Sequence, residues 1–532
     1  MSRRIEIYDT SLRDGTQAEN FNLSVEDKIK ICRQLDRLGV DYIEGGWPGA
    51  NPHAIDFFKK MRSIELKNAR LTAFGSTRHN SNRPEKDPNL QGLIEAKTPA
   101  ITIFGKSWDV HVQEALRISL EDNLVLIRES LHYLRPHAQN LLYDAEHFFD
   151  GFKCNREYCL ATIESAVAGG AETIVLCDTN GGTLPHEIPA IMAEVQKLLQ
   201  QQKHRVKIGI HAHNDSETGV ANSLVSIDLG ADQVQGTING YGERCGNSNL
   251  TSIIPALVFK MELDCGVKDN IDQLYSTSRL VDELANLPHN RYQPYVGESA
   301  FAHKGGIHVS AVKRNPLTYE HIEPEKVGNI RRILISDQAG RANVLMKAQK
   351  YGIPLESDDP LMASIVSEMK ELEKQGYQYE AAEASFELLM RRTLGLQRKF
   401  FKLEAFRVMN FKYSMTERPL TEATLRLYVG GNEVHTAAMG DGPVNALDKA
   451  LRKALIRFYP CLEKVELVDY KVRVLTGESG TGAKVRVLIE SRDEHDRWGT
   501  VGVSVNIIEA SWQALVDSMN YKLLKDDKTK HS

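Results

Sequence analysis

From residue 4 to about residue 260, short apolar runs alternate with longer amphipathic segments along the chain. The short runs are rich in Ile, Val, Leu, Phe and Tyr, as expected of buried strands. The segments between them, such as residues 25–38 and 156–168, carry apolar residues at helical spacing. The predicted strands are Ile5–Tyr8, Tyr42–Glu44, Arg70–Phe74, Ala100–Phe104, Asn140–Tyr143, Thr173–Cys177, Lys207–Ile210 and Gln233–Thr237.

Eight strands separated by helices predict an α/β fold of the closed (β/α)₈ type, a TIM barrel, which typically takes about 250 residues. The alternative is an open, doubly wound sheet. No GxGxxG sequence follows the first strand, which disfavours the dinucleotide-binding form of that sheet. We therefore predict a TIM-barrel domain over residues 1–270.

The remainder of the chain has two different textures. Residues 271–395 are punctuated by Pro and Gly and include the polar helical run 362–374, so we predict helical connecting subdomains. Residues 396–532 show strand-like alternation and predict a C-terminal α+β domain. Here the run from His435 weakly resembles the run from Gly499, each a strand leading into a helix. Two such copies suggest a pseudo-twofold module that could dimerise, although any two strand–helix units look somewhat alike.

Composition narrows the class of protein. The 532 residues are 42% hydrophobic and 26% charged with a net charge of −5, a globular profile. The sequence contains no basic run with interleaved aromatic residues, so nucleic-acid binding is not favoured. The N-terminus resembles no signal peptide, and no apolar stretch approaches the roughly 18 residues of a membrane span. The seven cysteines contain no CxxC pair, so we expect reduced thiols and a cytoplasmic location.

Polar residues gather where the predicted strands end. Such positions include the segments 9–17, 76–78, 178–180, 211–215 and 239–249. In TIM barrels the catalytic groups lie at the carboxyl ends of the strands. A barrel selected for stability alone has no reason to concentrate polar groups at this rim, so the pattern indicates an active site.

The sequence His211-Ala212-His213 points to a metal ion. Side chains alternate along a strand, so both imidazoles face the same way. Two imidazoles and a carboxylate suit a divalent cation with open coordination positions. Asp14, on the rim after the first strand, could supply the carboxylate. The alternative is a pair of surface histidines without a metal.

Three further motifs carry candidate groups. In DTSLRDGTQ, Arg13 could face a developing oxyanion, or it could form an ion-paired turn with Asp14. In NGYGERCGNSNL, Asn247 offers an amide oxygen, although Gly-rich loops are nonspecific. In FAHKGGIHVSA, His308 is either a core histidine or a base delivered to the barrel mouth.

These motifs, in this order, resemble the DRE-type TIM-barrel metal-dependent lyases and synthases. GGIHVSA and the C-terminal module narrow the resemblance to the 2-isopropylmalate, homocitrate and citramalate synthase family. The resemblance implies that Asp14, His211, His213 and Asn247 hold the metal and that Arg13 binds substrate and stabilises the alkoxide. Glu146 and Thr179 match positions that orient the substrate and assist the chemistry. His308 matches a general base that the partner subunit contributes.

The resemblance also implies the reaction. Members join acetyl-CoA to a 2-oxo acid with a divalent cation, Mg²⁺ or Mn²⁺ first and Zn²⁺ as an alternative. The enzyme would be an acyltransferase and a homodimer. The segment YIEGGWPGANP, with ITIFGKSWDVHV, is similar to the citramalate synthase branch, which implies pyruvate as acceptor and isoleucine as the feedback effector of the C-terminal domain. The alternative is 2-isopropylmalate synthase, which uses 2-oxoisovalerate.

The pocket for the acceptor side chain decides between these two. Phe74, Phe104 and Tyr143 end their predicted strands and are candidates to line it, or they pack the barrel top. Glu44 is either close to the site or a rim carboxylate. A lyase fits less well because lyases of this superfamily lack the C-terminal module, and a carboxylase would carry a biotinyl AMKM-like motif. A non-catalytic amino-acid sensor would not need competent residues at every ligand position.

Overall fold

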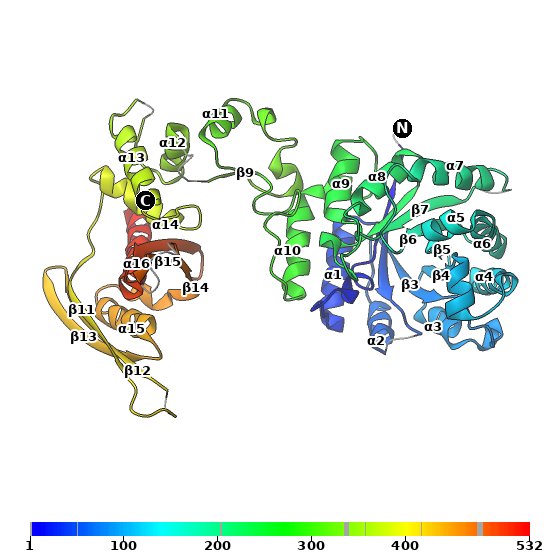
Figure 1. The fold of residues 1–532 in the computed structure, drawn as a ribbon, viewed down its shortest axis with the longest axis horizontal. Helices are drawn as coiled ribbons and strands as arrows, with labels where there is room; N and C mark the ends of the chain where they lie inside the picture. The colour runs from blue at the N-terminus through cyan, green and yellow to red at the C-terminus, as the bar shows by residue number, and fades with distance from the viewer. Residues whose placement is uncertain are drawn as a thin grey trace. The chain divides into compact units, whose positions relative to one another are not determined.

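The computed structural model describes residues 3–49, 52–202, 205–334, 340–356, 358–416, 418–475 and 482–531. The chain divides into two compact units (Figure 1). The first comprises residues 1–301 and 321–331, and the second comprises residues 302–320 and 332–532.

The first unit contains a closed barrel of eight parallel strands, which confirms the predicted α/β class. Each strand pairs with the next, and β1 pairs with β8 to close the ring. Most strands run one to three residues beyond the predicted ends because the polar rim residues still belong to the ladder. The strands are β1 (Glu6–Asp9), β2 (Tyr42–Gly46), β3 (Arg70–Ser76), β4 (Ala100–Lys106), β5 (Asn140–Glu146), β6 (Thr173–Asp178), β7 (Lys207–Ala212) and β8 (Gln233–Gly236).

Helices surround the barrel and bury the outward-facing side chains of its strands. Helix α1 begins where Ser24 and Asp27 form a capping box, and it ends at Gly39, which has a φ of +98°. The helices are α1 (Val25–Leu38), α2 (Pro52–Met61), α3 (Pro88–Ala96), α4 (Leu120–Leu134), α5 (Phe148–Cys154), α6 (Arg156–Gly169), α7 (Ile188–Leu199), α8 (Gly219–Asp228), α9 (Leu250–Phe259) and α10 (Leu274–Leu284).

The barrel interior is packed rather than hollow. Tyr8, Tyr42, Ala100 and Leu142 form a separate buried cluster inside the ring. The Tyr8 hydroxyl donates to Glu44 Oε2 at 2.6 Å, so the apolar layer passes directly into a polar one. The polar groups above it are therefore held on a filled base, as in other barrels of this class.

The second unit contains the predicted repeat in a longer form. Two three-stranded antiparallel sheets are each followed by a helix, so the repeating element is three strands and a helix rather than one strand and a helix. The first copy consists of β11 (Phe401–Phe411), β12 (Leu420–Val429), β13 (Asn432–Gly440) and α15 (Pro443–Leu455). The second consists of β14 (Glu466–Val474), β15 (Val485–Arg492), β16 (Arg497–Ser504) and α16 (Ile507–His531).

Short elements precede this module in the second unit. The two-residue strands β9 (Ala302–His303) and β10 (Arg332–Ile333) pair in parallel. They accompany α11 (Gly306–Arg314), α12 (Arg341–Lys350), α13 (Leu361–Lys374) and α14 (Glu383–Thr393).

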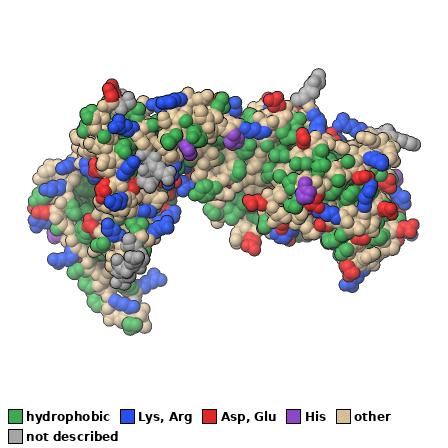
Figure 2. Space-filling model, turned by 45° about the horizontal axis from the view of Figure 1, so that its top comes forward, with side chains coloured by type: hydrophobic (Ala, Val, Ile, Leu, Met, Phe, Trp, Pro, Cys, Tyr) green, Lys and Arg blue, Asp and Glu red, His purple; other side chains and the backbone are tan. Residues whose placement is uncertain are grey.

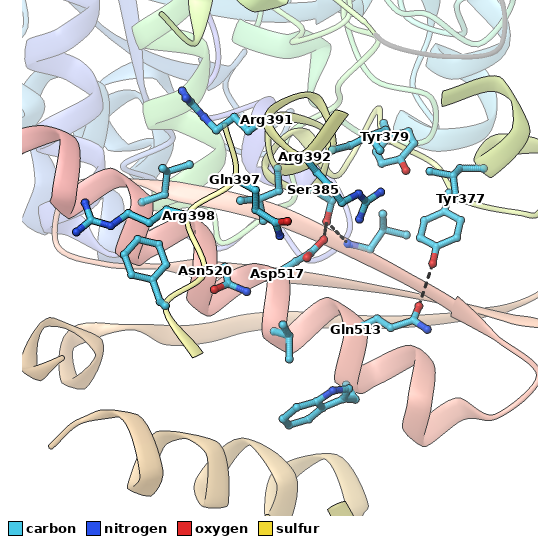
Figure 3. A pocket seen from close by; sticks show the side chains of 18 of the residues that line it. Tyr377, Tyr379, Ser385, Arg391, Arg392, Gln397, Arg398, Gln513, Asp517 and Asn520 are labelled. Atoms are coloured by element: carbon cyan, nitrogen blue, oxygen red, sulfur yellow. Dashed lines mark hydrogen bonds between the residues drawn. The ribbon is translucent and has the colours of Figure 1, made fainter. Parts of the chain in front are cut away.

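A cavity of about 370 Å³ lies among α14, α16 and β16 (Figure 3). The Ser385 hydroxyl donates to Asp517 Oδ2 at 2.6 Å and accepts from the backbone amide of Val501 at 3.0 Å. Tyr377 donates its hydroxyl hydrogen to Gln513 Oε1 at 3.0 Å. These bonds join three elements around the cavity.

The outer surface of the barrel unit carries both signs of charge. Figure 2 shows acidic and basic side chains intermingled over this unit on the face that it draws. Among the described residues, no helix is long and apolar enough to cross a membrane.

Candidate active site

The ligating atoms of Asp14, His211 and His213 all lie within 4.8 Å of one another at the barrel rim. All three side chains are buried. His211 Nε2 lies 3.2 Å from Asp14 Oδ2 and 3.4 Å from His213 Nε2. Ligands at about 2.0–2.2 Å from a common ion stand roughly 3 Å apart. The strand alternation that predicted both imidazoles on one face therefore gives a compact group suited to one divalent cation.

Gln235 on β8 fixes the orientation of His211. Its Oε1 lies 2.9 Å from His211 Nδ1, and its Nε2 donates to Asp144 Oδ1 at 3.3 Å. An amide oxygen can only accept, so Nδ1 carries the hydrogen and Nε2 is the ring nitrogen that faces Asp14 and His213. Sequence reasoning missed Gln235, although the alternation of Gln233 and Gln235 on one strand face was a visible signal.

Asn247 lies beside His213, with which it forms an isolated β-bridge. Its Nδ2 donates to the Tyr241 carbonyl at 3.3 Å, whereas its buried Oδ1 has no hydrogen-bond partner among the described residues. A buried amide oxygen without a donor is costly unless a ligand satisfies it. Asn247 therefore fits the role of a further oxygen ligand.

Arg13 connects the metal-binding cluster to the barrel interior. Its Nη1 donates to Asp14 Oδ1 at 2.8 Å, and its Nε donates to Glu44 Oε1 at 2.5 Å. The guanidinium also lies 3.8 Å from the ring centre of Phe74. Two carboxylates and the face of an aromatic ring thus hold the Arg13 guanidinium in place. Glu44 is fully buried and belongs to the site rather than to the solvent-exposed rim.

Glu146 and Thr179 both line the cavity next to this cluster. Glu146 forms an ion pair with Lys106, the last residue of β4. Thr179 Oγ1 accepts from the backbone amide of His147 at 2.9 Å. Both predicted residues therefore lie with the metal-binding group, and Lys106 is an additional charged neighbour that the sequence reading did not single out.

Burial and charge set the protonation of the cluster. Burial lowers the pKa of His213 to about 3, and the neighbouring His211 adds to this. Although burial opposes it, the Arg13 charge holds the pKa of Asp14 well below its usual range. A neutral imidazole and an ionised carboxylate are the forms that bind a cation. Burial also raises the pKa of Asp144, which contacts Gln235, to about 7.

Aromatic side chains form part of the wall of the cavity, which has a volume of about 270 Å³. The Phe74 and Phe104 rings stack with centroids 5.4 Å apart, and Trp47 meets both nearly at right angles. Phe74 and Phe104 therefore line the cavity, and their predicted role toward the acceptor side chain stays a prediction. The lining residues are Arg13, Asp14, Gln17, Trp47, Phe74, Phe104, Asp144, Glu146, Cys177, Thr179, His211, His213 and Glu243.

The same role predicted for Tyr143 is wrong. Asp144 and Glu146 of β5 line the cavity, so alternation turns Tyr143 outward into the hydrophobic layer beneath the helices. A Cβ at Gly105 would lie 2.6 Å from the Tyr143 hydroxyl and 3.2 Å from Ile127 of α4, which places the ring in that layer. Tyr143 is a packing residue.

His308 belongs to the second unit, in α11. Its side chain is exposed, and its ring stacks on Tyr319 with centroids 4.2 Å apart. The interpretation of His308 as a core histidine is therefore wrong. Its neighbour Ile307 is 81% exposed, so this helix presents both residues at the surface of its unit.

Three family models match the chain in succession. Residues 4–281 match the HMGL-like family. Residues 295–377 match the homocitrate synthase post-HMGL domain-like family, and residues 380–523 match the LeuA allosteric (dimerisation) domain. The HMGL-like match covers the barrel and its candidate metal-binding group, Asp14, His211 and His213.

Curated relatives match over nearly the whole length. The (R)-citramalate synthase of Geobacter sulfurreducens is 56% identical, with 99% of both chains covered. That of Aquifex aeolicus is 54% identical, again with 99% of both chains covered. A probable 2-isopropylmalate synthase of Methanopyrus kandleri is 33% identical over 98% of both chains. With its HMGL-like barrel and these full-length relatives, the chain belongs to the (R)-citramalate synthase family.

Proposed function

We propose that this protein is an acyltransferase that condenses acetyl-CoA with pyruvate to give citramalate and free CoA. The observation that carries the proposal is that the group Asp14, His211 and His213 lines one cavity together with an aromatic wall of Trp47, Phe74 and Phe104. A cation held by this group would act on the carbonyl group of the keto acid, and the aromatic wall leaves room for a small acceptor side chain. Full-length relatives named (R)-citramalate synthase support the same reaction.

A divalent cation, Mg²⁺ or Mn²⁺ in the first place and Zn²⁺ as an alternative, would be held by Asp14, His211, His213 and Asn247. When bound, it supplies Lewis acidity to the carbonyl under attack. Arg13 donates hydrogen bonds toward the oxygen that becomes negative as the carbon–carbon bond forms. Because Glu44 and Asp14 hold the guanidinium in advance, it need not reorganise during the reaction.

Glu146 and Thr179 would orient the pyruvate carboxylate and keto group. A general base takes a proton from the acetyl methyl group, and the resulting carbon nucleophile attacks the keto carbon of pyruvate. The alkoxide is protonated, and water then cleaves the thioester to a carboxylate and a free thiol. We assign the base to His308, contributed by the partner subunit of a homodimer. Its exposed position in α11 agrees with this assignment.

Complementation tests the assignment of His308. His308→Ala and Asp14→Ala homodimers should each be inactive. Mixing them under conditions that exchange subunits should restore up to about a quarter of wild-type activity. In each mixed dimer, one barrel keeps Asp14 and receives an intact His308 from the other subunit. No recovery, despite demonstrated subunit exchange, would place the base within one chain.

We further propose that the segment matching the LeuA allosteric domain binds isoleucine and lowers the activity of the barrel. Isoleucine should inhibit the full-length protein more strongly than leucine or valine. A coupling of about 1–3 kcal/mol is ordinary for such control. We also propose a cytoplasmic location, in keeping with seven cysteines free of disulfides.

Thiol release tests the reaction itself. Protein loaded with Mg²⁺ or Mn²⁺ should release free CoA from acetyl-CoA when pyruvate is added, and much more slowly with 2-oxoisovalerate. The second candidate is 2-isopropylmalate synthase, represented among the relatives at 33% identity. Faster turnover of 2-oxoisovalerate than of pyruvate would replace the first proposal with the second.

A further inference from the structure

Trp47 completes the aromatic wall of the cavity. Its ring lies 5.5 Å from that of Phe104 and 6.1 Å from that of Phe74, at 85° and 88°. Phe74 carries the Arg13 guanidinium 3.8 Å from its ring centre. The wall is therefore continuous with the group proposed to stabilise the developing oxygen charge, and it lies where the rest of the acceptor must fit.

A β-bulge turns Trp47 toward the cavity. On a regular β2, Trp47 would share the outward face of Ile43 and Gly45. The register with β3 shifts between Glu44 and Gly46, so that Glu44 pairs with Thr72 but Gly46 pairs with Ala73. The extra residue reverses the alternation, and Trp47 then corresponds to the inward-facing Phe74. Gly46 has a φ of +141°, which favours glycine at this bend.

Asn89 of α3 holds the indole in place. Trp47 Nε1 donates to Asn89 Oδ1 at 2.6 Å, and Asn89 Nδ2 donates to the Ser76 carbonyl at 2.6 Å. Two glycines make room for this amide: a Cβ on Gly75 would lie 2.9 Å from Asn89 Oδ1, and one on Gly49 would lie 3.0 Å from it. The asparagine thus fixes the ring to the end of β3.

We propose that Trp47 is the residue that limits the size of the acceptor side chain and that Asn89 is its positioning residue. This inference rests on the proposed condensation. A ring held by the bulge and by Asn89 cannot move aside for a branched acid, whereas unheld aromatic side chains can change rotamer. One or two methylenes in a pocket alter discrimination by about 10–200-fold. Trp47 therefore excludes larger 2-oxo acids by steric overlap.

The test compares kcat/KM for pyruvate, 2-oxobutyrate and 2-oxoisovalerate by thiol release from acetyl-CoA with the full-length protein. In Trp47→Ala, the ratio of 2-oxobutyrate to pyruvate should rise about 10- to 100-fold. Asn89→Ala leaves the ring present but unheld, and the ratio should rise several-fold. Trp47→Phe, which loses the hydrogen bond to Asn89, should behave like Asn89→Ala. Val195→Ala, a buried change in α7 outside the barrel, controls for general loosening.

The outcomes distinguish a failure of the proposed function from a failure of the inference about Trp47 alone. If wild-type protein releases no thiol with any of the three acids, the proposed function fails, and the inference about Trp47 fails with it. If wild-type protein is active and both Trp47→Phe and Asn89→Ala keep the wild-type ratio, Trp47 does not set the size limit. If Trp47→Ala is inactive with all three acids, the ratio of 2-oxobutyrate to pyruvate in Asn89→Ala decides whether Trp47 sets the size limit. The Mn²⁺ affinity and the KM for pyruvate of Asn89→Ala show whether the rest of its site is intact. An equal rise in Val195→Ala would also overturn the assignment.

Discussion

Of the two cavities described above, the larger is not the one lined by the candidate catalytic groups. The cavity of the second unit measures about 370 Å³ and that of the barrel about 270 Å³. In the second unit, Ser385, Asp517, Tyr377 and Gln513 use their polar groups on one another and on the backbone. At the barrel rim, Asn247 Oδ1 and His213 Nδ1 are buried without hydrogen-bond partners among the described residues.

The difference shows what identifies a reactive site. Volume measures only space, whereas an unsatisfied buried polar group costs about 1–3 kcal/mol and persists when function requires it. In the barrel, three metal-ligating atoms converge and a cation would satisfy them. In the second cavity, the polar groups already join helices to a strand. We therefore expect changes at the barrel cavity to affect activity, and changes at Asp517 to affect stability.

The largest effect should come from the metal ligands. Asp14→Ala or His211→Ala should reduce activity by at least about 10³-fold, because the Lewis acid and its position are lost. Mn²⁺ binding, measured by equilibrium dialysis, should fall in parallel. His137→Ala, an exposed histidine of the same unit, is the control. If both ligand variants keep metal binding and activity, the barrel cavity does not differ from the second cavity in the way stated above.

Arg13→Lys should lower kcat by about 10²–10³-fold while leaving Mn²⁺ binding within a few-fold of wild type. A lysine keeps the charge but cannot bridge Asp14 and Glu44 with separate nitrogens while presenting a donor to substrate. Arg156→Lys, on the outer helix α6, provides the matched control. A variant with wild-type kcat would mean that Arg13 serves only as the internal counter-ion of two carboxylates.

Gln235→Leu should weaken Mn²⁺ binding by about 10–100-fold, because His211 loses the partner that fixes its tautomer. Gln233 lies two residues earlier on the same face of β8. Gln233→Leu therefore tests whether loss of any polar side chain inside the barrel weakens Mn²⁺ binding. Both variants can be compared by Mn²⁺ titration and by thiol release. Equal losses in the two would assign the effect to general packing.

Asp517→Asn should leave activity without added amino acid unchanged and should alter stability with pH. Burial raises the pKa of Asp517 to about 6, above its ordinary value of 3.8. Its contribution to stability is therefore present below about pH 4 and is lost as the pH rises through about 6, because the native state then gives up a proton that it holds more tightly than the unfolded chain. Relative to wild type, the variant should gain about 1–3 kcal/mol between pH 4 and pH 8 in urea unfolding.

This result would also break or sustain the comparison of the two cavities. Altered thiol release in Asp517→Asn would show that the second cavity takes part in catalysis or its control. A stability difference independent of pH would mean that the Asp517 carboxylate is ionised at the same pH in the folded and unfolded chain. The first finding would contradict the structural role assigned to the bonds of Figure 3, and the second would contradict the raised pKa of Asp517.

Local pattern in the sequence was sufficient for the barrel and for the central groups of its site. Apolar strands at regular spacing predicted β1 to β8, and strand alternation alone placed His211 and His213 on one face. Residues at strand ends converge in a barrel because all carboxyl ends of parallel strands meet at one rim. The positions of Glu146 and Thr179 follow from this rule, because Glu146 ends β5 and Thr179 comes directly after β6, and Arg13 and Asp14 lie in the loop after β1.

Tertiary structure alone decided which aromatic residues face the cavity of the barrel. Tyr143 ends a predicted strand as Phe104 does, yet β5 continues to Glu146 and its alternation turns Tyr143 away. Trp47 faces inward only because a bulge adds one residue to β2, and Asn89, which holds it, lies 42 positions further along the chain. Register shifts and hydrogen bonds between distant elements depend on how neighbouring strands and helices pack, which no local pattern of apolar and polar residues encodes.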